Sequence, residues 1–184
     1  MARQAQTATA VLGVLSIEDL TGYEVRQAIT SVLGHFWHES FGQIYPTLAE
    51  LVRDGLVSAG PGDRARSTRY RITASGRARL RKLLAEPPES QAPRNGLLLR
   101  IFFGRSLDDE ALADLLDDVE SQAGSKLATY SEIRDGIGDD PSFPVHGRYW
   151  EATLRAGELA AEAQLRWVAE TRAALLTPAT LPPL

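Results

Sequence analysis

Few residues in this 184-residue chain have the types and spacing that catalysis or metal binding requires. The most suggestive segment is HFWHE at residues 35–39, which combines two imidazoles with a carboxylate. Zinc proteases need the glutamate inside an H-E-x-x-H spacing, and here it follows the second histidine instead. We interpret the segment as a packed connector with Trp37 in the core. A metal or catalytic cluster of His35, His38 and Glu39 is the alternative.

Other kinds of enzyme chemistry have little support in the sequence. The chain has three histidines and no cysteine, and it lacks a G-x-S-x-G nucleophile motif. The GPGDR stretch at residues 60–64 is too short for a phosphate-binding loop, and no Lys-Ser/Thr pair ends it. The acidic run at residues 108–110 falls at a predicted helix N-terminus, where negative charge is favourable. We therefore expect no catalytic residue, no cofactor and no metal.

The distribution of charge suggests a polyanion as the partner of the first half. Residues 1–85 hold 11 Lys and Arg against 7 Asp and Glu, whereas residues 86–184 hold 9 against 17. A basic module followed by an acidic one suggests that only the first meets DNA. The alternative is a solvated basic face. The basic residues late in the first half are Arg53, Arg64, Arg66, Arg69, Arg71, Arg77, Arg79, Arg81 and Lys82.

The bulk composition fits a cytoplasmic protein with a packed core. Hydrophobic residues make up 43% of the chain, and the longest apolar run is far short of the roughly 20 residues that a membrane helix needs. No charged-then-apolar leader is visible at the start of the sequence. The lack of cysteine fits a reducing compartment. We expect no membrane association and a cytoplasmic location.

Residues 40–57 are predicted to form one helix with a sharp stop. Ser40 and Gln43 can cap its first turn reciprocally. Gly55 suits the position just past the end of the helix, where a positive φ is common and glycine adopts it most easily. One side forms an apolar stripe of Ile44, Leu48, Leu51 and Val52. The opposite side mixes hydrogen-bonding groups with small residues, which suits a DNA major groove; an ordinary surface helix is the alternative. That side carries Gln43, Tyr45, Pro46, Ala49, Glu50 and Arg53.

The segments around this helix predict a winged helix-turn-helix. A preceding helix begins at a Thr21–Glu24 capping pair and ends near Gly34. After the central helix the apolar residues recur with a period of two, which is typical of β-strands. Residues 56–58 and 66–72 are therefore predicted to pair as a hairpin around the turn at residues 59–63. Thr73 then caps a further helix. The hairpin, with its basic tip, would be the wing that runs along the DNA backbone or minor groove.

The second half is predicted to be helical. Residues 86–95 form a proline-rich linker, residues 96–176 a helical domain, and residues 177–184 a disordered tail. The segment at residues 96–103 is too short for a membrane and too apolar for an exposed helix. Residues 145–176 carry apolar positions at a nearly heptad spacing. Both segments would expose too much apolar surface in a monomer, so we expect a two-fold dimer.

Several segments closely resemble the PadR family of transcriptional regulators. In the first half these are GYEVRQAI, HFW, GQIYPTLAELVRDGLV and RYRITASGRARL. In the second half LLLRIFFG and YWEATLRAGELAAEAQLRWV resemble the helical domain of members with a long C-terminal region. The resemblance covers roughly residues 8–176. It implies a homodimeric winged helix whose C-terminal helices form the dimer interface and often an effector site. Thr68 and Ala65 depart from the family's usual basic residue and proline in the wing.

Together these observations predict a mainly α protein with a small β-hairpin: an N-terminal winged helix-turn-helix, residues 1–85, and a C-terminal helical dimerisation domain. We expect a sequence-specific DNA-binding regulator, a repressor, that acts as a homodimer on a palindromic operator. A winged-helix protein-interaction module without DNA binding is the alternative. The expected DNA-binding residues are Ser40, Gln43, Tyr45, Thr47, Arg53, Arg64, Arg66 and Arg69.

The helical domain is expected to provide the dimer interface and a site for a small aromatic or apolar effector. Trp150 and Trp167 could line such a cavity, with Phe102, Phe103 and Tyr149 as neighbours, or they could be dimer core. The residues expected to serve dimerisation or effector binding are Leu98, Phe102, Phe103, Tyr149, Trp150, Leu154, Ala161, Leu165, Trp167 and Val168.

Overall fold

The computed structural model describes residues 2–31, 33–34, 36–37, 41–62, 67–88 and 95–176. The chain divides into two compact units, Met1–Gln91 and Ala92–Leu184, and each is described here by itself. Within the described residues, no helix is both long enough and apolar enough to cross a membrane.

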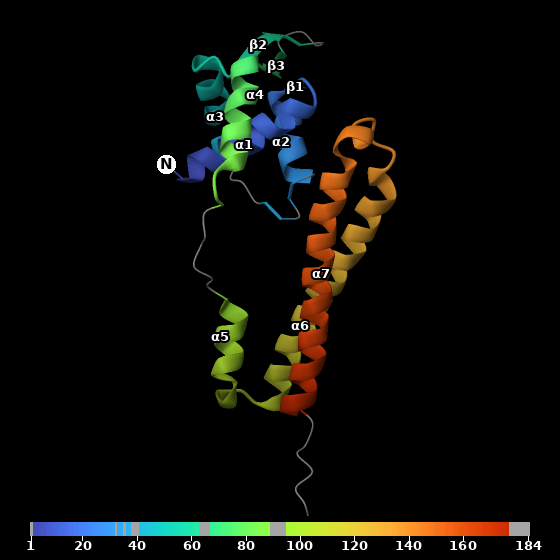
Figure 1. The fold of residues 1–184 in the computed structure, drawn as a ribbon. Helices are drawn as coiled ribbons and strands as arrows, with labels where there is room; N and C mark the ends of the chain where they lie inside the picture. The colour runs from blue at the N-terminus through green and yellow to red at the C-terminus, as the bar shows by residue number, and fades with distance from the viewer. Residues whose placement is uncertain are drawn as a thin grey trace, which may run out of the picture. The chain divides into compact units, whose positions relative to one another are not determined.

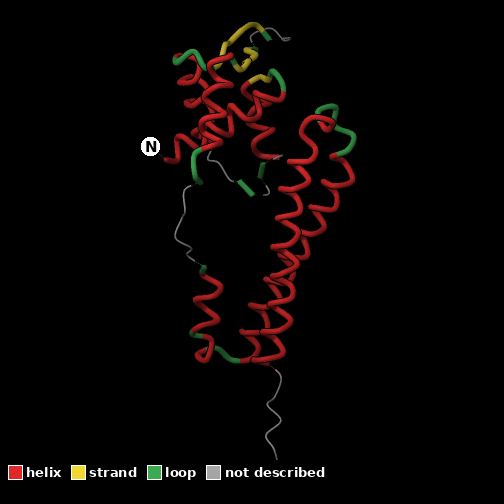
Figure 2. Tube along the Cα trace, viewed as in Figure 1, coloured by secondary structure: helices red, strands yellow, loops and turns green. Residues whose placement is uncertain are grey.

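Unit 1 combines helices with a small antiparallel sheet (Figure 1). The helices are α1 (Ala2–Ile17), α2 (Gly22–Ser31), α3 (Phe41–Arg53) and α4 (Ala74–Ala85). The strands are β1 (Leu20–Thr21), β2 (Val57–Pro61) and β3 (Thr68–Ile72). β3 lies in the middle of the sheet and pairs with both neighbours. The strands are coloured yellow in Figure 2. This arrangement confirms the predicted winged helix.

Local capping fixes the starts of two helices as the sequence predicted. The Thr21 N–H donates to Glu24 Oε2 at 2.7 Å, and the Glu24 N–H donates to Thr21 Oγ1 at 3.3 Å. These reciprocal bonds satisfy two N–H groups that the first helical turn leaves without partners. The Gly76 N–H donates to Thr73 Oγ1 at the start of α4. Gly55 follows α3 with a φ of 69°, the left-handed conformation that glycine tolerates best.

The strand β1 was not predicted from the sequence. It is two residues long, so it leaves no alternating pattern to detect. Leu20 pairs with Tyr70 and Thr21 pairs with Arg69, which ties the start of α2 to the wing strand β3. The β2–β3 hairpin pairs Val57 with Ile72 at one end and Pro61 with Thr68 at the other.

The core of unit 1 lies between α1 and the apolar faces of α2, α3 and α4. Ile44, Leu48 and Leu51 of the predicted stripe are buried, and Val52 packs against them. Trp37 also packs against this core. Pro46 lies inside α3, further along than the first-turn position expected for a proline. Because proline has no N–H, the Gly42 carbonyl lacks its usual partner in the helix.

Unit 2 consists of α5 (Gly96–Phe102), the short helix η1 (Gly104–Ser106), α6 (Asp109–Ile137) and α7 (Phe143–Leu176). The two long helices run antiparallel as a hairpin (Figure 1). Asp108 caps α6 by accepting the Ala111 N–H at 2.8 Å. Asn95 caps α5 by accepting the N–H groups of Leu97 and Leu98. α7 begins two residues before the predicted start at residue 145.

Candidate nucleic-acid interface and dimer surface

The exposed face of α3 is the centre of the candidate nucleic-acid interface. Gln43, Pro46, Ala49 and Arg53 are exposed, and the Tyr45 side chain is 48% exposed. The opposite face is anchored in the core of unit 1. Gln43 offers both donors and acceptors, Tyr45 a hydroxyl and Arg53 a positive charge. A helix with one face fixed and these groups on the other can enter a major groove.

The structure corrects the expectation for Thr47. Its side chain is 3% exposed, so it faces the core and cannot reach a nucleic acid. The physical reason is its position: Thr47 lies three residues after Ile44 and one before Leu48, on the buried side of a helix with 3.6 residues per turn.

Two wing arginines are tied to Asp19, in the loop between α1 and β1. The half-buried Arg69 side chain donates from Nη1 to the Asp19 carbonyl at 2.5 Å. Arg71 donates from Nε to Asp19 Oδ2 at 2.7 Å, and its side chain stays largely exposed. The prediction that Arg69 contacts phosphate therefore needs correction, because its guanidinium holds the wing to the body of unit 1. Arg71 is the exposed cation on β3, and sequence reasoning left it out of the site.

Three residues predicted for the interface, Ser40, Arg64 and Arg66, lie outside the described residues. So do His35, His38 and Glu39 of the considered metal cluster. Within the described residues, no group of three or more His, Asp or Glu side chains could hold a metal ion. Arg53 is exposed, and its Nε forms a 3.1 Å ion pair with its neighbour Asp54. An exposed pair of this kind is weak and can exchange for a phosphate.

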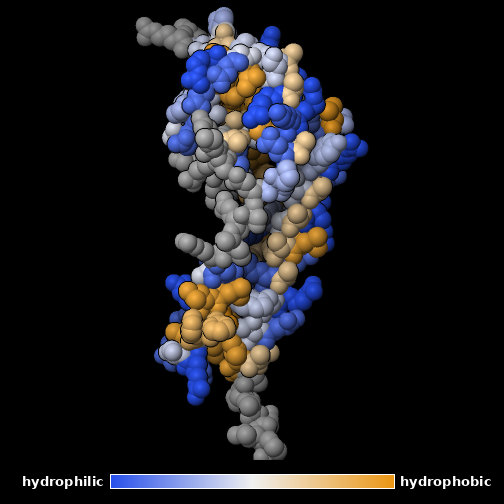
Figure 3. All heavy atoms as spheres, turned by 60° about the vertical axis from the view of Figure 1, so that its left-hand side comes forward, coloured by the Kyte–Doolittle hydropathy of each residue, from blue (hydrophilic) through white to orange (hydrophobic). Residues whose placement is uncertain are grey.

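An apolar face on α5 is the candidate dimer surface of unit 2. Leu97 and Ile101 face inward and pack against the core of the long hairpin. The outward residues are Leu98, Leu99, Phe102 and Phe103, and Phe102 is 81% exposed (orange in Figure 3). The rings of Phe102 and Phe103 meet edge to face, with centroids 5.0 Å apart. Exposed patches of large apolar side chains mark interaction surfaces.

The predicted apolar seam of α7 has a different role from the one expected. Leu154, Ala161 and Val168 are buried within the chain, where α6 and α7 pack together. Trp167 packs against the same core near Val168, and Leu165 is half-buried. The seam was expected to face a second copy. Because α6 already covers its buried positions, these residues cannot form an open dimer surface.

A group of aromatic residues lies near the start of α7. His146 stacks on Trp150 with ring centroids 5.7 Å apart, and Arg148 lies over the exposed Tyr149 ring. Trp150 is half-buried. At 1.5 Å per residue, Trp150 lies roughly 27 Å along α7 from Val168, where α5 packs. The predicted neighbours Phe102 and Phe103 are therefore not beside Trp150 within one chain.

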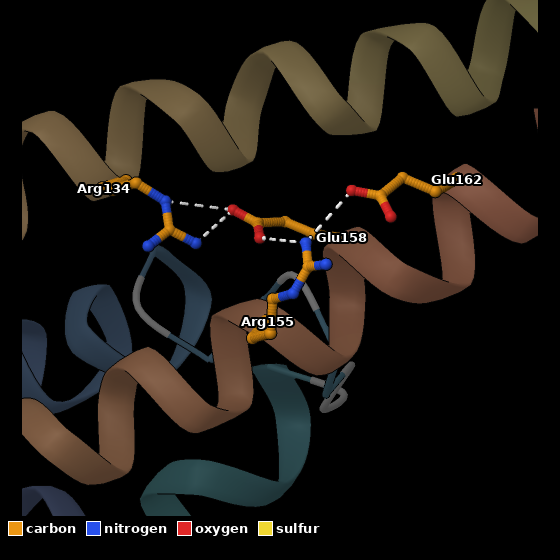
Figure 4. Close-up of polar contacts among 4 residues, drawn as sticks. All are labelled: Arg134, Arg155, Glu158 and Glu162. Carbon is orange, nitrogen blue, oxygen red and sulfur yellow. Dashed lines mark hydrogen bonds and ion pairs between the residues drawn. The ribbon is translucent and has the colours of Figure 1, made fainter.

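Ion pairs hold α6 and α7 together along their exposed edges. Glu158 of α7 accepts from Arg134 of α6 and from Arg155 of its own helix (Figure 4). These hydrogen bonds, Arg134 first, lower the pKa of Glu158 below its ordinary value. Further along the hairpin Arg172 bridges Asp117 at 2.7 Å and Glu120 at 2.8 Å. Those carboxylates, Asp117 first, raise the pKa of Arg172.

Comparison with known families matches both units. Residues 11–82 match the model described as "Transcriptional regulator PadR-like family", and residues 93–175 match "Virulence activator alpha C-term". The negative transcriptional regulator PadR of Bacillus subtilis is 28% identical over 123 residues, 65% of this chain and 68% of that protein. The probable transcriptional regulator Rv1176c of Mycobacterium tuberculosis is 28% identical over 180 residues, 90% of this chain and 95% of that protein.

Solved structures share the fold over nearly the whole chain. Bacillus subtilis PadR with operator DNA gives a TM-score of 0.76 at 24% identity, covering 91% of this chain and 97% of that one. The same protein with p-coumaric acid gives 0.73 at 24% identity, covering 92% and 98%. The Vibrio cholerae virulence activator AphA gives 0.71 at 25% identity, covering 92% and 98%.

A winged helix with an exposed α3 face, joined to a long helical hairpin, defines a transcriptional regulator of the winged-helix class. The chain combines a domain of the PadR-like family, residues 11–82, with a C-terminal domain of the virulence-activator type, residues 93–175. This family consists of transcriptional regulators rather than enzymes.

The ion pairs of Glu158 generate a prediction about the stability of the helical hairpin. The pKa of Glu158 is lowered in the folded state, so the ionised carboxylate stabilises that state. This stabilisation is fully present above the ordinary glutamate pKa and is lost as the pH falls through the lowered pKa of the folded state. At neutral pH, Glu158→Gln should lower the thermal unfolding temperature, measured by circular dichroism. At acid pH, the variant and the native protein should unfold at the same temperature. Glu162→Gln is the matched control.

Glu162 makes one ion pair, with Arg155, and its side chain is 41% exposed against 12% for Glu158. Its substitution should therefore cost less stability than that of Glu158. Equal losses for the two variants, or a loss for Glu158→Gln that persists at acid pH, would contradict this role of Glu158.

Proposed function

We propose that this regulator is a homodimeric repressor that binds a palindromic operator through the exposed face of α3. The contrast between the two faces of that helix supports the proposal. Ile44 and Leu48 are buried in the core, whereas Gln43, Tyr45 and Arg53 are exposed to solvent. In this proposal Gln43 reads base edges in the major groove, and Tyr45 and Arg53 contact phosphates. The protein acts in the cytoplasm by binding rather than by catalysis.

The wing supplies the second contact with the duplex. Arg71 is the exposed cation of β3 in the described structure, and its partner Asp19 leaves it at the surface. The sequence adds Arg64 and Arg66, which lie between β2 and β3 along the chain. Contacts from these cations neutralise phosphates without reading sequence, so they add affinity and register rather than specificity.

Repression is the direction of control that the relatives favour. The Bacillus subtilis relative is a negative transcriptional regulator, and operator DNA is present in one of its structures. The Vibrio cholerae protein of the same fold is an activator. A repressor blocks polymerase simply by occupying DNA, whereas activation needs a further protein surface. A winged-helix interaction module without DNA binding remains the competing function.

The dimer in this proposal forms through α5. Its outward leucines and phenylalanines are the largest group of exposed apolar side chains on the described part of unit 2, and the seam of α7 is already covered by α6. A second copy offers the same face, and a self-complementary patch closes with two-fold symmetry. Two α3 helices would then reach half-sites about 34 Å apart, or a multiple of that spacing.

The aromatic group at the start of α7 is proposed as the effector site. Trp150 is half-buried beside His146, and the neighbouring Tyr149 and Val145 are exposed. Flat rings of this kind suit a small aromatic or apolar molecule, and a p-coumaric acid complex is known for Bacillus subtilis PadR. A ligand that prefers one packing of the dimer shifts the population that binds DNA, by no more than its differential affinity.

DNA binding can be tested by fluorescence anisotropy with the protein's own promoter region over a series of salt concentrations. Arg53→Ala should weaken binding to all sequences alike. It should also reduce the magnitude of the log–log salt slope by roughly 0.9 for each phosphate that the variant no longer neutralises. Gln43→Ala should instead reduce discrimination between promoter and unrelated duplex, by about 1–3 kcal/mol.

Lys126→Ala is the matched control, because it removes the same charge from an exposed position on α6. It should leave both the affinity and the slope almost unchanged. Binding without any salt dependence, or no binding at all, would favour the interaction-module alternative.

The dimer can be tested by sedimentation at micromolar concentration. The native chain should be a dimer, and Phe102→Glu should convert it to a monomer, because a charge buried in an apolar interface is costly to desolvate. Leu84→Glu is the control, since Leu84 is a 67% exposed leucine on α4, in the other unit. A native monomer, or a Phe102→Glu variant that stays dimeric, would rule out the α5 interface.

The effector site can be tested with p-coumaric acid as the probe and Trp150→Ala as the variant. If Trp150 lines the site, the variant should remain dimeric and bind DNA, while the ligand should no longer release it. Trp167→Ala, at a half-buried ring that packs against the core of the hairpin, should instead cost stability, by less than the roughly 3–5 kcal/mol typical of a fully buried tryptophan. If aromatic ligands neither quench tryptophan fluorescence nor alter DNA binding of the native protein, the effector proposal fails.

A further inference from the structure

We propose that Gly22 positions Tyr45 for DNA binding, because the missing side chain of this glycine leaves room for the Tyr45 ring against the start of α2. This inference rests on the proposed function, since Tyr45 is one of the proposed phosphate contacts. It assigns a role in recognition to a buried residue that lies outside the helix that reads DNA.

Three elements of unit 1, namely α2, α3 and the wing strand β3, meet at Gly22. A Cβ atom added at this position would lie 3.0 Å from Cε1 of Tyr45, on α3. It would also lie 3.6 Å from Cε2 of Tyr70, on the wing strand β3. Gly22 itself is the first residue of α2 and is buried. At Gly22 a hydrogen atom therefore takes the place of a side chain where α2, α3 and the wing strand β3 pack together.

The backbone gives no separate reason for a glycine here. Gly55 is the glycine with a positive φ among the described residues, so Gly22 has a conformation that alanine can also adopt. Alanine is favoured over glycine in a helix by up to about 1 kcal/mol. The advantage of glycine must therefore come from the space that it leaves, and the nearest atoms in that space belong to Tyr45.

An added methyl group would displace Tyr45 rather than the main chain of α2. The Thr21–Glu24 capping bonds fix the first turn, and the pairing of Leu20 with Tyr70 fixes the strand before it. Tyr45 is half-exposed and can rotate outward. A contact of 3.0 Å is shorter than the ordinary range of 3.4–4 Å, so the ring must shift by a few tenths of an ångström. Its hydroxyl would then leave the position set for a phosphate.

The test is a double-mutant cycle on promoter binding, measured by fluorescence anisotropy with the full-length protein. Gly22→Ala should weaken binding roughly three- to thirtyfold, which lies within the range that coupling between residues in contact allows. In a Tyr45→Ala background, the same change should have no further effect. The thermal unfolding temperature should not fall in Gly22→Ala. Gly13→Ala is the matched control, because a Cβ at Gly13, on α1, meets no atom within 4 Å.

The binding and unfolding measurements distinguish a failure of the proposed role of Gly22 from a failure of the proposed function on which it rests. If the native protein does not bind promoter DNA, the proposed function fails, and the role of Gly22 fails with it. If the native protein binds but Gly22→Ala is harmless, or weakens binding equally with and without Tyr45, only the role of Gly22 is overturned. If Gly22→Ala lowers the unfolding temperature and Tyr45→Ala does not restore it, the methyl group has displaced the main chain, which also overturns the inference.

Discussion

Burial of the apolar stripe of α3 is the constraint on which the candidate nucleic-acid interface depends. Ile44, Leu48 and Leu51 pack into the core that α1 builds, and their burial fixes the rotation of the helix about its own axis. Because side chains repeat every 3.6 residues, that rotation decides which residues face solvent and which do not. Gln43 and Tyr45 are exposed for this reason, and Thr47 is not. Specific reading of bases needs such a fixed helix, because a few tenths of an ångström separate a good hydrogen bond from a poor one.

The wing is held to the same frame by contacts between segments distant in sequence. β1 pairs with β3, and Asp19 binds one wing arginine through its carbonyl and another through its carboxylate. The two arginines, Arg69 and Arg71, are separated by one residue yet differ in role, since Arg69 lies opposite Thr21 of β1, whereas Arg71 lies beyond the end of that pairing. One guanidinium is half-buried and the other reaches solvent. The length of β1 thus leaves the Arg69 guanidinium half-buried against the Asp19 carbonyl and the Arg71 guanidinium at the surface, in an ion pair with the Asp19 carboxylate.

Unit 2 shows how a helical hairpin can cover its own apolar seam while a neighbouring short helix keeps apolar side chains exposed. α6 covers Leu154, Ala161 and Val168 of α7, and ion pairs such as Arg134–Glu158 fix the two helices along their edges. α5 is only seven residues long, and the partly buried Leu97 and Ile101 on one of its sides pack against that hairpin. Its other side, with Phe102 and Phe103, is left without a partner among the described residues of this chain. The most exposed large apolar side chain in the described part of unit 2, Phe102, therefore lies on the shortest α-helix of the unit.

The sequence by itself determined the elements whose causes are local: the Thr21–Glu24 capping box, the Thr73 cap, the left-handed Gly55, the β2–β3 hairpin and the long helices of the second half. It also determined the exposed face of α3 apart from Thr47, which is buried, and Glu50, which is half-buried, since that face follows from helical periodicity. The tertiary structure alone decided the strand β1, the Asp19 contacts of Arg69 and Arg71, the covered seam of α7 and the contact of Gly22 with Tyr45. Each of these joins residues on different elements, and the types and spacing of residues along one segment do not record which other segment will pack against it.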